Sequence, residues 1–263
     1  MSQSSVKIIQ ITDCHLGEAH GDELLSMNPD ESLCDVLSLV NTDHPKADFL
    51  VATGDLANAP SIPAYQRLHH TLSSSIDYPF AWLPGNHDDP AMMQAVGEFV
   101  NVKVHIVGAW LIVLLNSRVE GHIYGQLSHE ELAFLETTLQ AHQDKHVMVC
   151  LHHQLVPIGS QWMDKYIVRN NSDVWSLIDR YDHVKIILWG HVHQEFSDTY
   201  NNVALLATPS TCIQFTPGQK DFHVENAMPG YRWLELHSDG SFDSGVERVT
   251  EKNYGTDVHS HGY

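Results

Sequence analysis

The sequence has 263 residues, 43% of them hydrophobic, which is typical of a folded chain with a sizeable core rather than of a disordered one. Its 33 acidic and 14 basic residues give a net charge of −19, which disfavours non-specific binding to nucleic acid and to anionic membranes. The longest near-apolar run, residues 107–115, is shorter than the roughly 20 residues that span a bilayer. The 20 histidines stand out beside so few lysines and arginines.

Short apolar runs that end in polar residues predict five buried strands. In chain order they span residues 7–13, 49–55, 80–86, 147–153 and 184–191. Helical patterns lie between them: residues 33–40 behind a Pro29-Asp30 start, residues 132–139 behind a Ser128-x-x-Glu131 capping box, and residues 172–181. Strands are also predicted without helices between them, namely a hairpin of residues 104–107 and 110–116 and two late strands at 203–207 and 231–236.

This order of elements predicts an α/β fold with two sheet layers and outer helices, an α-β-β-α sandwich. We expect residues 1–248 to form one domain and residues 249–263 to form a polar, frayed C-terminal tail. Residues 216–230 are polar and rich in glycine and proline, which favours a loop over a site. The polar N-terminus has no export signal and the four scattered cysteines lack paired spacing, so we expect a cytoplasmic protein with reduced thiols.

The polar residues that close the five strands predict a metal site. The first run ends in Asp13-Cys14-His15, and in an extended chain the carboxylate and the imidazole point to the same side. The other four end in Gly54-Asp55, Gly85-Asn86-His87-Asp88, His152-His153 and Gly190-His191-Val192-His193. Carboxyl ends of strands gather at one edge of such a sheet, so the five strands deliver their ligands to one place. Oxygen and nitrogen donors without thiolate favour Mn²⁺, iron or Zn²⁺, and the joint pattern predicts a two-metal centre.

The order of these motifs resembles that of the calcineurin-like metallophosphoesterase superfamily. The residues that carry the resemblance are Asp13-x-His15, Gly54-Asp55, Gly85-Asn86-His87-Asp88, His152 and Gly190-His191-x-His193. Further stretches, above all Thr208-Pro209-Ser210-Thr211-Cys212, resemble the bacterial class III 3′,5′-cyclic-AMP phosphodiesterases. Together they cover nearly the whole chain. The resemblance implies the metallophosphoesterase sandwich, with a dinuclear metal site at the carboxyl ends of the strands.

The resemblance also implies a role for each matching residue. Asp13, His15 and His193 hold one metal ion, Asn86, His152 and His191 hold the other, and Asp55 bridges the two. His87 is the catalytic residue beside the phosphate or the leaving oxygen. The residues expected to contact the substrate are His15, Asp55, Asn86, His87, His152 and His193.

One motif departs from the family pattern. The family usually has proline directly after the histidines of the fourth strand, whereas this chain has His152-His153-Gln154-Leu155. Counting back from Pro157 selects His152 as the ligand. His153 is the weaker candidate, or a residue that sits beside the site.

The implied reaction is hydrolysis of 3′,5′-cyclic AMP to 5′-AMP by a hydroxide activated between two divalent ions, which lowers cellular cAMP. The implied ions are Fe²⁺ and/or Mn²⁺, with Zn²⁺ as a further option. Their charge makes the site attractive to a small anion despite the acidic chain. Two alternatives stay open: a relaxed phosphodiesterase for glycerophosphodiesters or 2′,3′-cyclic nucleotides, and a catalytically inactive metal-binding scaffold. We expect no nucleic-acid or membrane partner, and the oligomeric state stays open.

The remaining motifs have plainer interpretations. Five tryptophans lie in apolar runs and are expected in the core rather than as base-stacking platforms. They are Trp82, Trp110, Trp175, Trp189 and Trp233. Residues 169–171 and 208–212 either line the substrate pocket or form a solvated turn and a strand end.

Overall fold

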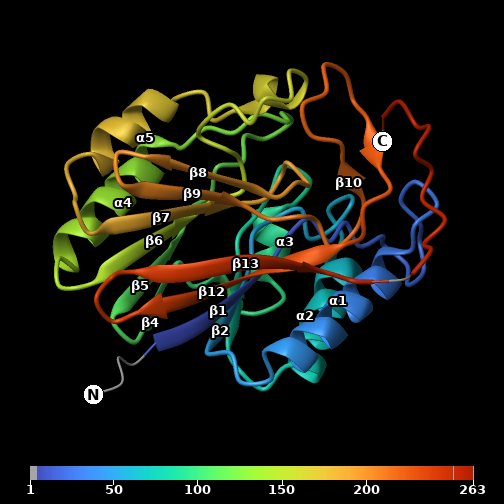
Figure 1. Cartoon of the computed structure of the whole chain (residues 1–263), viewed down its shortest axis with the longest axis horizontal. Coiled ribbons are helices and arrows are strands. Elements are labelled where there is room, and N and C mark those ends of the chain that lie inside the picture. Colours follow the sequence, from blue (N-terminus) through green and yellow to red (C-terminus); the bar gives the residue numbers. More distant parts are fainter. Residues whose placement is uncertain (1–4, 251, 263) are drawn as a thin grey trace.

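In a computed structural model, two β-sheets pack face to face and helices cover both outer faces (Figure 1). The structure describes residues 5–250 and 252–262. The predicted α-β-β-α sandwich is confirmed. No helix in these described ranges is long and apolar enough to cross a membrane.

The first sheet has the strand order β13-β12-β1-β2-β3. Its strands are β1 (Ser5–Ile11), β2 (Phe49–Ala52), β3 (Phe80–Trp82), β12 (Gly230–His237) and β13 (Phe242–Arg248). Strands β1, β2 and β3 are parallel, while β12 and β13 extend the sheet in antiparallel fashion. The helices of this half are α1 (Pro29–Asp43), α2 (Ile62–Ser75), α3 (Pro90–Gln94) and the short 3-10 helix η1 (Phe99–Asn101).

The second sheet has the strand order β4-β5-β6-β7-β9-β8. Its strands are β4 (Val104–Val107), β5 (Trp110–Leu114), β6 (His146–Cys150), β7 (Val184–Trp189), β8 (Phe196–Tyr200) and β9 (Val203–Ala207). The four inner strands are parallel, and β4 and β8 run antiparallel at the edges. Its other elements are α4 (His129–Ala141), η2 (Met163–Tyr166), α5 (Asn171–Ile178) and a separate ribbon of β10 (Gln214–Phe215) and β11 (Val224–Glu225).

The helix starts follow from capping side chains. The Asn28 side chain accepts a hydrogen bond from the Glu31 amide at 3.1 Å, and Pro29 occupies the first position of α1. The Ser128 hydroxyl accepts from the Glu131 amide at 3.2 Å and begins α4. Each cap satisfies an amide that lacks a partner within the helix, and the predicted starts are confirmed.

Three apolar clusters fill the spaces between the four layers. In β1, Ile8 packs between the two sheets, whereas Ile9 and Ile11 belong to the cluster formed with α1 and α2. In β5, Ile112 faces the first sheet and Leu111 belongs to the cluster formed with α4 and α5. Both faces of these strands are buried, which is why they are mainly apolar in the sequence.

Residues 252–262 form neither helix nor strand, yet they pack against the domain instead of fraying as expected. Lys252 pairs with Glu31 at 2.8 Å, and the Tyr254 hydroxyl donates to Asp35 at 2.7 Å. The amide of Asp257 donates to the Leu25 carbonyl at 2.8 Å. In Figure 1 this red segment runs along the blue loop that precedes α1. The domain boundary at residue 248 stays a prediction.

Candidate metal centre

The loops that follow β1, β2, β3, β6 and β7 meet at one edge of the two sheets and bring the predicted ligands together. Four groups of side chains offer ligand atoms that lie within 4.8 Å of one another. They are Asp13 with His15 and His193, Asp13 with Asp55 and His152, His15 with Asp55 and His87, and His152 with His153 and His191. Asn86 lines the same cavity as Asp55 and His191. All predicted site residues therefore gather in one place.

Asp13, His15 and His193, which we predicted to hold one ion, form a buried cluster. His193 Nε2 lies 3.3 Å from Asp13 Oδ1 and 3.2 Å from His15 Nε2. His193 Nδ1 donates to the Ile213 carbonyl at 2.8 Å, so the lone pair of the neutral ring is on Nε2. A lone pair and a carboxylate held this close away from water repel each other, and a cation between them removes that repulsion.

The ligands predicted for the second ion include buried atoms that lack a hydrogen-bond partner. Asn86 Oδ1 and His191 Nε2 have none among the described residues. Nδ1 of His152 donates to the Thr53 carbonyl at 2.8 Å, and its Nε2 lies 3.2 Å from Asp55 Oδ2. Buried polar atoms without partners are costly, so these atoms fit the binding of a metal ion.

Asp55 lies between the two sets of ligands. Its Oδ2 is 3.2 Å from His152 Nε2 and 3.9 Å from His15 Nε2, while its Oδ1 accepts from the His87 amide at 2.9 Å. Burial disfavours the charged carboxylate, yet His152 and His87 hold the pKa of Asp55 well below its ordinary value. One ionised carboxylate thus faces a ligand from each set, as a bridging residue must.

The raised pKa of His152 indicates that this position favours positive charge. Burial opposes the charged ring, but Asp55 and Asp13 outweigh burial and raise the pKa of His152 to about 9. A proton on the ring and a metal ion therefore compete for the same place beside Asp55. Metal ions displace such protons, because the imidazole must be neutral to act as a ligand.

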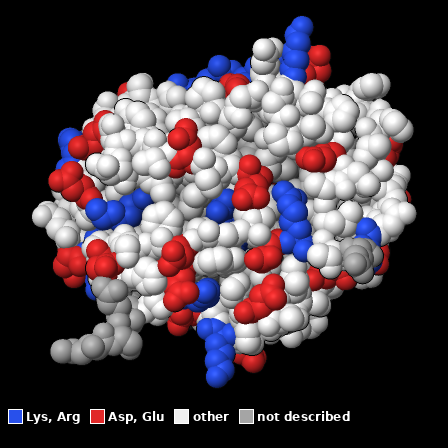
Figure 2. Space-filling view, in the orientation of Figure 1, with Lys and Arg blue, Asp and Glu red and all other residues white. Residues whose placement is uncertain are grey.

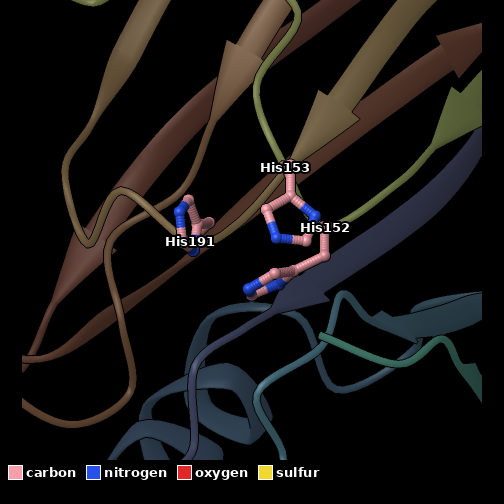
Figure 3. A group of neighbouring side chains, drawn as sticks. All are labelled: His152, His153 and His191. Atoms are coloured by element: carbon pink, nitrogen blue, oxygen red, sulfur yellow. The ribbon is translucent and has the colours of Figure 1, made fainter. Parts of the chain in front are cut away.

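Figure 3 shows His152, His153 and His191 close together at the strand ends. Both ring nitrogens of His153 have protein partners, since Nδ1 lies 2.8 Å from the Ser117 hydroxyl and Nε2 lies 2.9 Å from the Ile123 carbonyl. Burial lowers the pKa of His153 to about 3, so the ring is neutral. Its centroid is 4.9 Å from that of His152 and 4.7 Å from that of His191. This geometry favours His152 as the ligand and His153 as its packing support.

The site residues lie in tight turns beyond the strands, not in extended chain as predicted from the sequence. Their φ angles are between 47° and 65°, in the left-handed region, for Asp13, His15, Asp55, His191 and His193. Residues other than glycine are uncommon there and cost of order 1–3 kcal/mol each, and such strain clusters at functional sites. The predicted convergence is therefore right, but the turns produce it.

Asp88 fixes two of these turns to each other. Its carboxylate accepts from the amides of Leu56 at 3.1 Å and Gly85 at 2.9 Å, and from the Tyr65 hydroxyl at 3.1 Å. Burial and the nearby Asp55 raise the pKa of Asp88. These bonds tie the turn that carries Asp55 to the turn that carries Asn86 and His87.

A cavity of about 230 Å³ opens beside the ligands. Its polar side consists of Asp55, Asn86, His87 and His191. Its other side is mostly apolar and consists of Ile123, Trp162, Met163, Tyr166, Phe215, Phe222 and Gly262. The loop of residues 216–230 contributes Phe222, as expected of a loop over a site. Trp162 is the one tryptophan outside the predicted core set, and the short stretch Gln161-Trp162-Met163-Asp164 gave no pattern by which to assign it.

The comparisons with known proteins agree with this geometry. Residues 6–195 match the model of the calcineurin-like phosphoesterase family. The 3′,5′-cyclic adenosine monophosphate phosphodiesterase CpdA of Pseudomonas aeruginosa is 38% identical, with 100% of this chain and 97% of that protein aligned. The protein of the same name from Escherichia coli K12 is 39% identical, with 99% and 96% aligned.

Among solved structures, a dimetal phosphatase from Danio rerio has the same fold. It superposes with a TM-score of 0.63 at 13% identity, over 93% of this chain and 99% of that one. The fold is therefore shared even where the sequences have diverged. With a family model matched over most of its length and relatives matched from end to end, this chain belongs to the calcineurin-like phosphoesterase family.

Proposed function

We propose that the protein hydrolyses 3′,5′-cyclic AMP to 5′-AMP at a centre of two divalent metal ions, and so lowers cellular cAMP. The observation that carries the proposal is the cluster of carboxylate and imidazole side chains at one sheet edge, whose ligand atoms lie within 4.8 Å of one another in four groups, with the buried Asn86 Oδ1 beside them. The substrate is supported by the end-to-end similarity to proteins named as cAMP phosphodiesterases, which reaches 39% identity.

In this proposal each ion has its own ligand set. The ligands are Asp13, His15 and His193 for one ion, Asn86, His152 and His191 for the other, and Asp55 for both. Two divalent ions, when bound, would polarise the phosphodiester and activate a water molecule for in-line attack. We propose Fe²⁺ and/or Mn²⁺, with Zn²⁺ as a further fit, since the donor set has imidazole and carboxylate but no thiolate.

His87 acts on the substrate in this scheme. It lines the cavity beside Asp55 and Asn86. Its Nδ1 donates to the Asn58 carbonyl at 2.8 Å, and its ring meets that of His15 edge to face at 5.0 Å. With both ring nitrogens protonated, a ring held in this way can donate the Nε2 proton to the 3′ oxygen as the cyclic diester opens and keep the proton on Nδ1. The other proposed substrate contacts are His15, Asp55, Asn86, His152 and His193.

The charge of the site suits a small anionic substrate only with metal ions present. The chain has a net charge of −19, and the described lining of the cavity contains no lysine or arginine. On the face shown in Figure 2, basic side chains stand among acidic ones rather than in a continuous track. We therefore propose a small-molecule substrate rather than a nucleic-acid or membrane partner, and a cytoplasmic location as inferred from the sequence.

The test joins metal analysis to a substrate panel. Protein stripped with a chelator and reloaded with Mn²⁺ or Fe²⁺ should bind about two ions per chain and convert 3′,5′-cAMP to 5′-AMP. The panel adds 3′,5′-cGMP, 2′,3′-cAMP and a generic aryl diester. Asp55→Asn should lose both bound metal and turnover, whereas Asp48→Asn, at the other end of β1 beside Lys7, should keep both.

Each alternative has its own outcome in this test. Strong turnover of the other diesters without turnover of 3′,5′-cAMP would overturn the proposed substrate and favour the relaxed phosphodiesterase. Two bound ions without turnover of any diester would favour the inactive scaffold.

A further inference from the structure

Three aromatic side chains form a continuous wall on the apolar side of the cavity. We call Trp162, Phe215 and Phe222 the aromatic wall. Their ring centroids lie 5.0 to 5.3 Å apart, each pair edge to face. Phe215 also stacks on His193, with centroids 4.2 Å apart and the planes only 13° from parallel. The aromatic wall therefore reaches from the cavity to a proposed metal ligand.

The aromatic wall is not fully covered by the protein itself. Phe215 is buried, but Trp162 and Phe222 are only half-buried and line the cavity. Ile123, on the same cavity, has 49% of its surface exposed. Apolar surface that lines a pocket beside a few convergent polar groups is typical of a ligand site, where an apolar part of the ligand covers it.

Hydrogen bonds hold together the two loops that carry Trp162 and Phe222. The amide of Gln161, next to Trp162, donates to the Gln219 carbonyl at 2.9 Å. The amide of Gly218 donates to the Ser160 hydroxyl at 3.0 Å. Trp162 and Phe222 are thus placed beside each other before any ligand binds, which reduces the ordering that binding requires.

The two sides of the cavity describe the ligand. The polar side, with Asp55, Asn86 and His87, adjoins the proposed metal ions and receives an anionic group. The opposite side offers aromatic faces and edges, which favour a flat uncharged ring. A nucleotide has both parts, because its base is joined to its phosphate through ribose. The glycerol of a glycerophosphodiester has no such ring.

We propose that Trp162 and Phe222 bind the base of the cyclic nucleotide and make the site specific for nucleotides over diesters that lack a base. This inference rests on the proposed function, since it assumes a phosphodiester at the metal ions. A purine presents a larger flat surface than a pyrimidine, and the aromatic wall therefore favours purines.

The test compares two ligands that differ only in the base. Calorimetry of the Mn²⁺-loaded protein gives the affinities for 5′-AMP and for ribose 5-phosphate. In the unchanged protein 5′-AMP should bind more tightly. Trp162→Leu and Phe222→Leu should each lower the ratio of the two affinities by at least about fivefold, the lower range for loss of one aromatic stacking partner. The affinity for ribose 5-phosphate should stay the same.

A matched control is Trp175→Leu, because Trp175 packs on Tyr200 at 4.3 Å and lies outside the cavity lining. The ratio of the affinities for 5′-AMP and ribose 5-phosphate should be the same in Trp175→Leu as in the unchanged protein. The ratio in Trp162→Phe should lie between the ratios of Trp162→Leu and the unchanged protein. Metal content and melting temperature equal to those of the unchanged protein would show that the variants are folded. Equal affinity of the unchanged protein for both ligands, or an unchanged ratio in folded Trp162→Leu and Phe222→Leu, would overturn the inference.

The outcome separates this inference from the proposed function. A protein that prefers 5′-AMP through the aromatic wall but does not hydrolyse 3′,5′-cAMP would contradict the function and retain the base site. A protein that hydrolyses 3′,5′-cAMP equally well in all variants, with unchanged affinity ratios, would contradict the base site and retain the function.

Discussion

At His87, His152 and His193 the main chain decides which ring nitrogen faces the site. Each Nδ1 donates to a carbonyl oxygen 2.8 Å away. Two of the carbonyls belong to the loop after β2 and the third to the loop after β9. The result is the same in each ring, because Nε2 is left to act toward metal or substrate. Hydrogen bonds of this kind orient a ring and raise its basicity. The rings are therefore set in place by the fold itself.

His87 is the residue whose role is easiest to separate from metal binding. The His87→Ala variant should keep its metal content and lose at least about tenfold in turnover of 3′,5′-cAMP, since general acid catalysis contributes this much or more. Mass spectrometry of the metals and steady-state kinetics check the two halves of the prediction. His70→Ala, on the exposed face of α2, is the control and should change neither. Full turnover in His87→Ala would exclude the proton-donor role.

At the scale of the elements, glycines let the turns that carry the ligands approach one another. A Cβ atom on Gly85 would lie 2.1 Å from Asp55 Oδ1 and 2.4 Å from the Asp55 amide nitrogen. Both atoms belong to the residue that faces both ligand sets. A methyl group there must displace the turn after β2, and the ligands move with it.

Gly85→Ala should therefore lower the metal content and destabilise the fold by about 1–3 kcal/mol, as overpacking does. Metal analysis and urea denaturation measure the two effects. Gly97→Ala is the matched control, because its nearest contact would be an ordinary 3.5 Å to Val100. A fully metal-loaded Gly85→Ala variant of normal stability would show that the close packing of these turns is not required.

The sequence predicts the inner strands better than the outer ones. Strands such as β1 and β7 are buried on both faces and form apolar runs. The edge strand β8 has four exposed residues out of five and forms no such run, and the antiparallel edge strand β13 is likewise polar. Neither was predicted, whereas the edge strands β3 and β4 were, because β8 and β13 have no apolar run of their own and take their conformation from pairing with a neighbour.

The candidate site divides in the same way. Residue type and position at strand ends predicted which side chains gather, including Asp13 and His193. The left-handed turns could not be predicted, because they depend on contacts between loops such as the bond from the Asp13 amide to the Gly54 carbonyl at 2.9 Å. Trp162 and Phe222 come from two loops that are far apart in the sequence, and no sequence pattern indicates that the two side chains lie side by side.

At the scale of the whole molecule, the 20 histidines have two different fates. Those at the strand ends converge on the candidate metal centre. Others are partly buried elsewhere, and burial lowers the pKa of His44, His105 and His183. Histidine abundance is therefore not a sign of metal binding in itself. The partly buried histidines away from the candidate metal centre instead affect how the stability of the fold changes with acid.

Acidification should destabilise the fold through these buried histidines. A lowered pKa means that below about pH 6.5 the unfolded chain binds more protons than the folded chain. The contribution of these neutral histidines to stability is therefore complete above that pH and is lost as the pH falls. Urea unfolding of the metal-free protein and of histidine variants between pH 7.5 and pH 5.5 should show the loss as a difference between variants, since the raised pKa of His152 acts in the opposite direction in all of them. The free energy of unfolding of His105→Gln should fall less than that of the unchanged protein, because a glutamine does not titrate. The free energy of unfolding of the exposed variant His70→Gln should fall as much as that of the unchanged protein. Equal losses in all three would contradict the prediction.

The course of the C-terminal tail has a practical consequence for preparing the protein. Gly262 belongs to the lining of the cavity, whereas Ser5 begins β1 at the end of the sheet away from the ligands. An affinity tag of histidines attached beyond Gly262 would start at this cavity and compete for the proposed ions with the native imidazoles. A tag at the N-terminus keeps purification and metal analysis independent of each other.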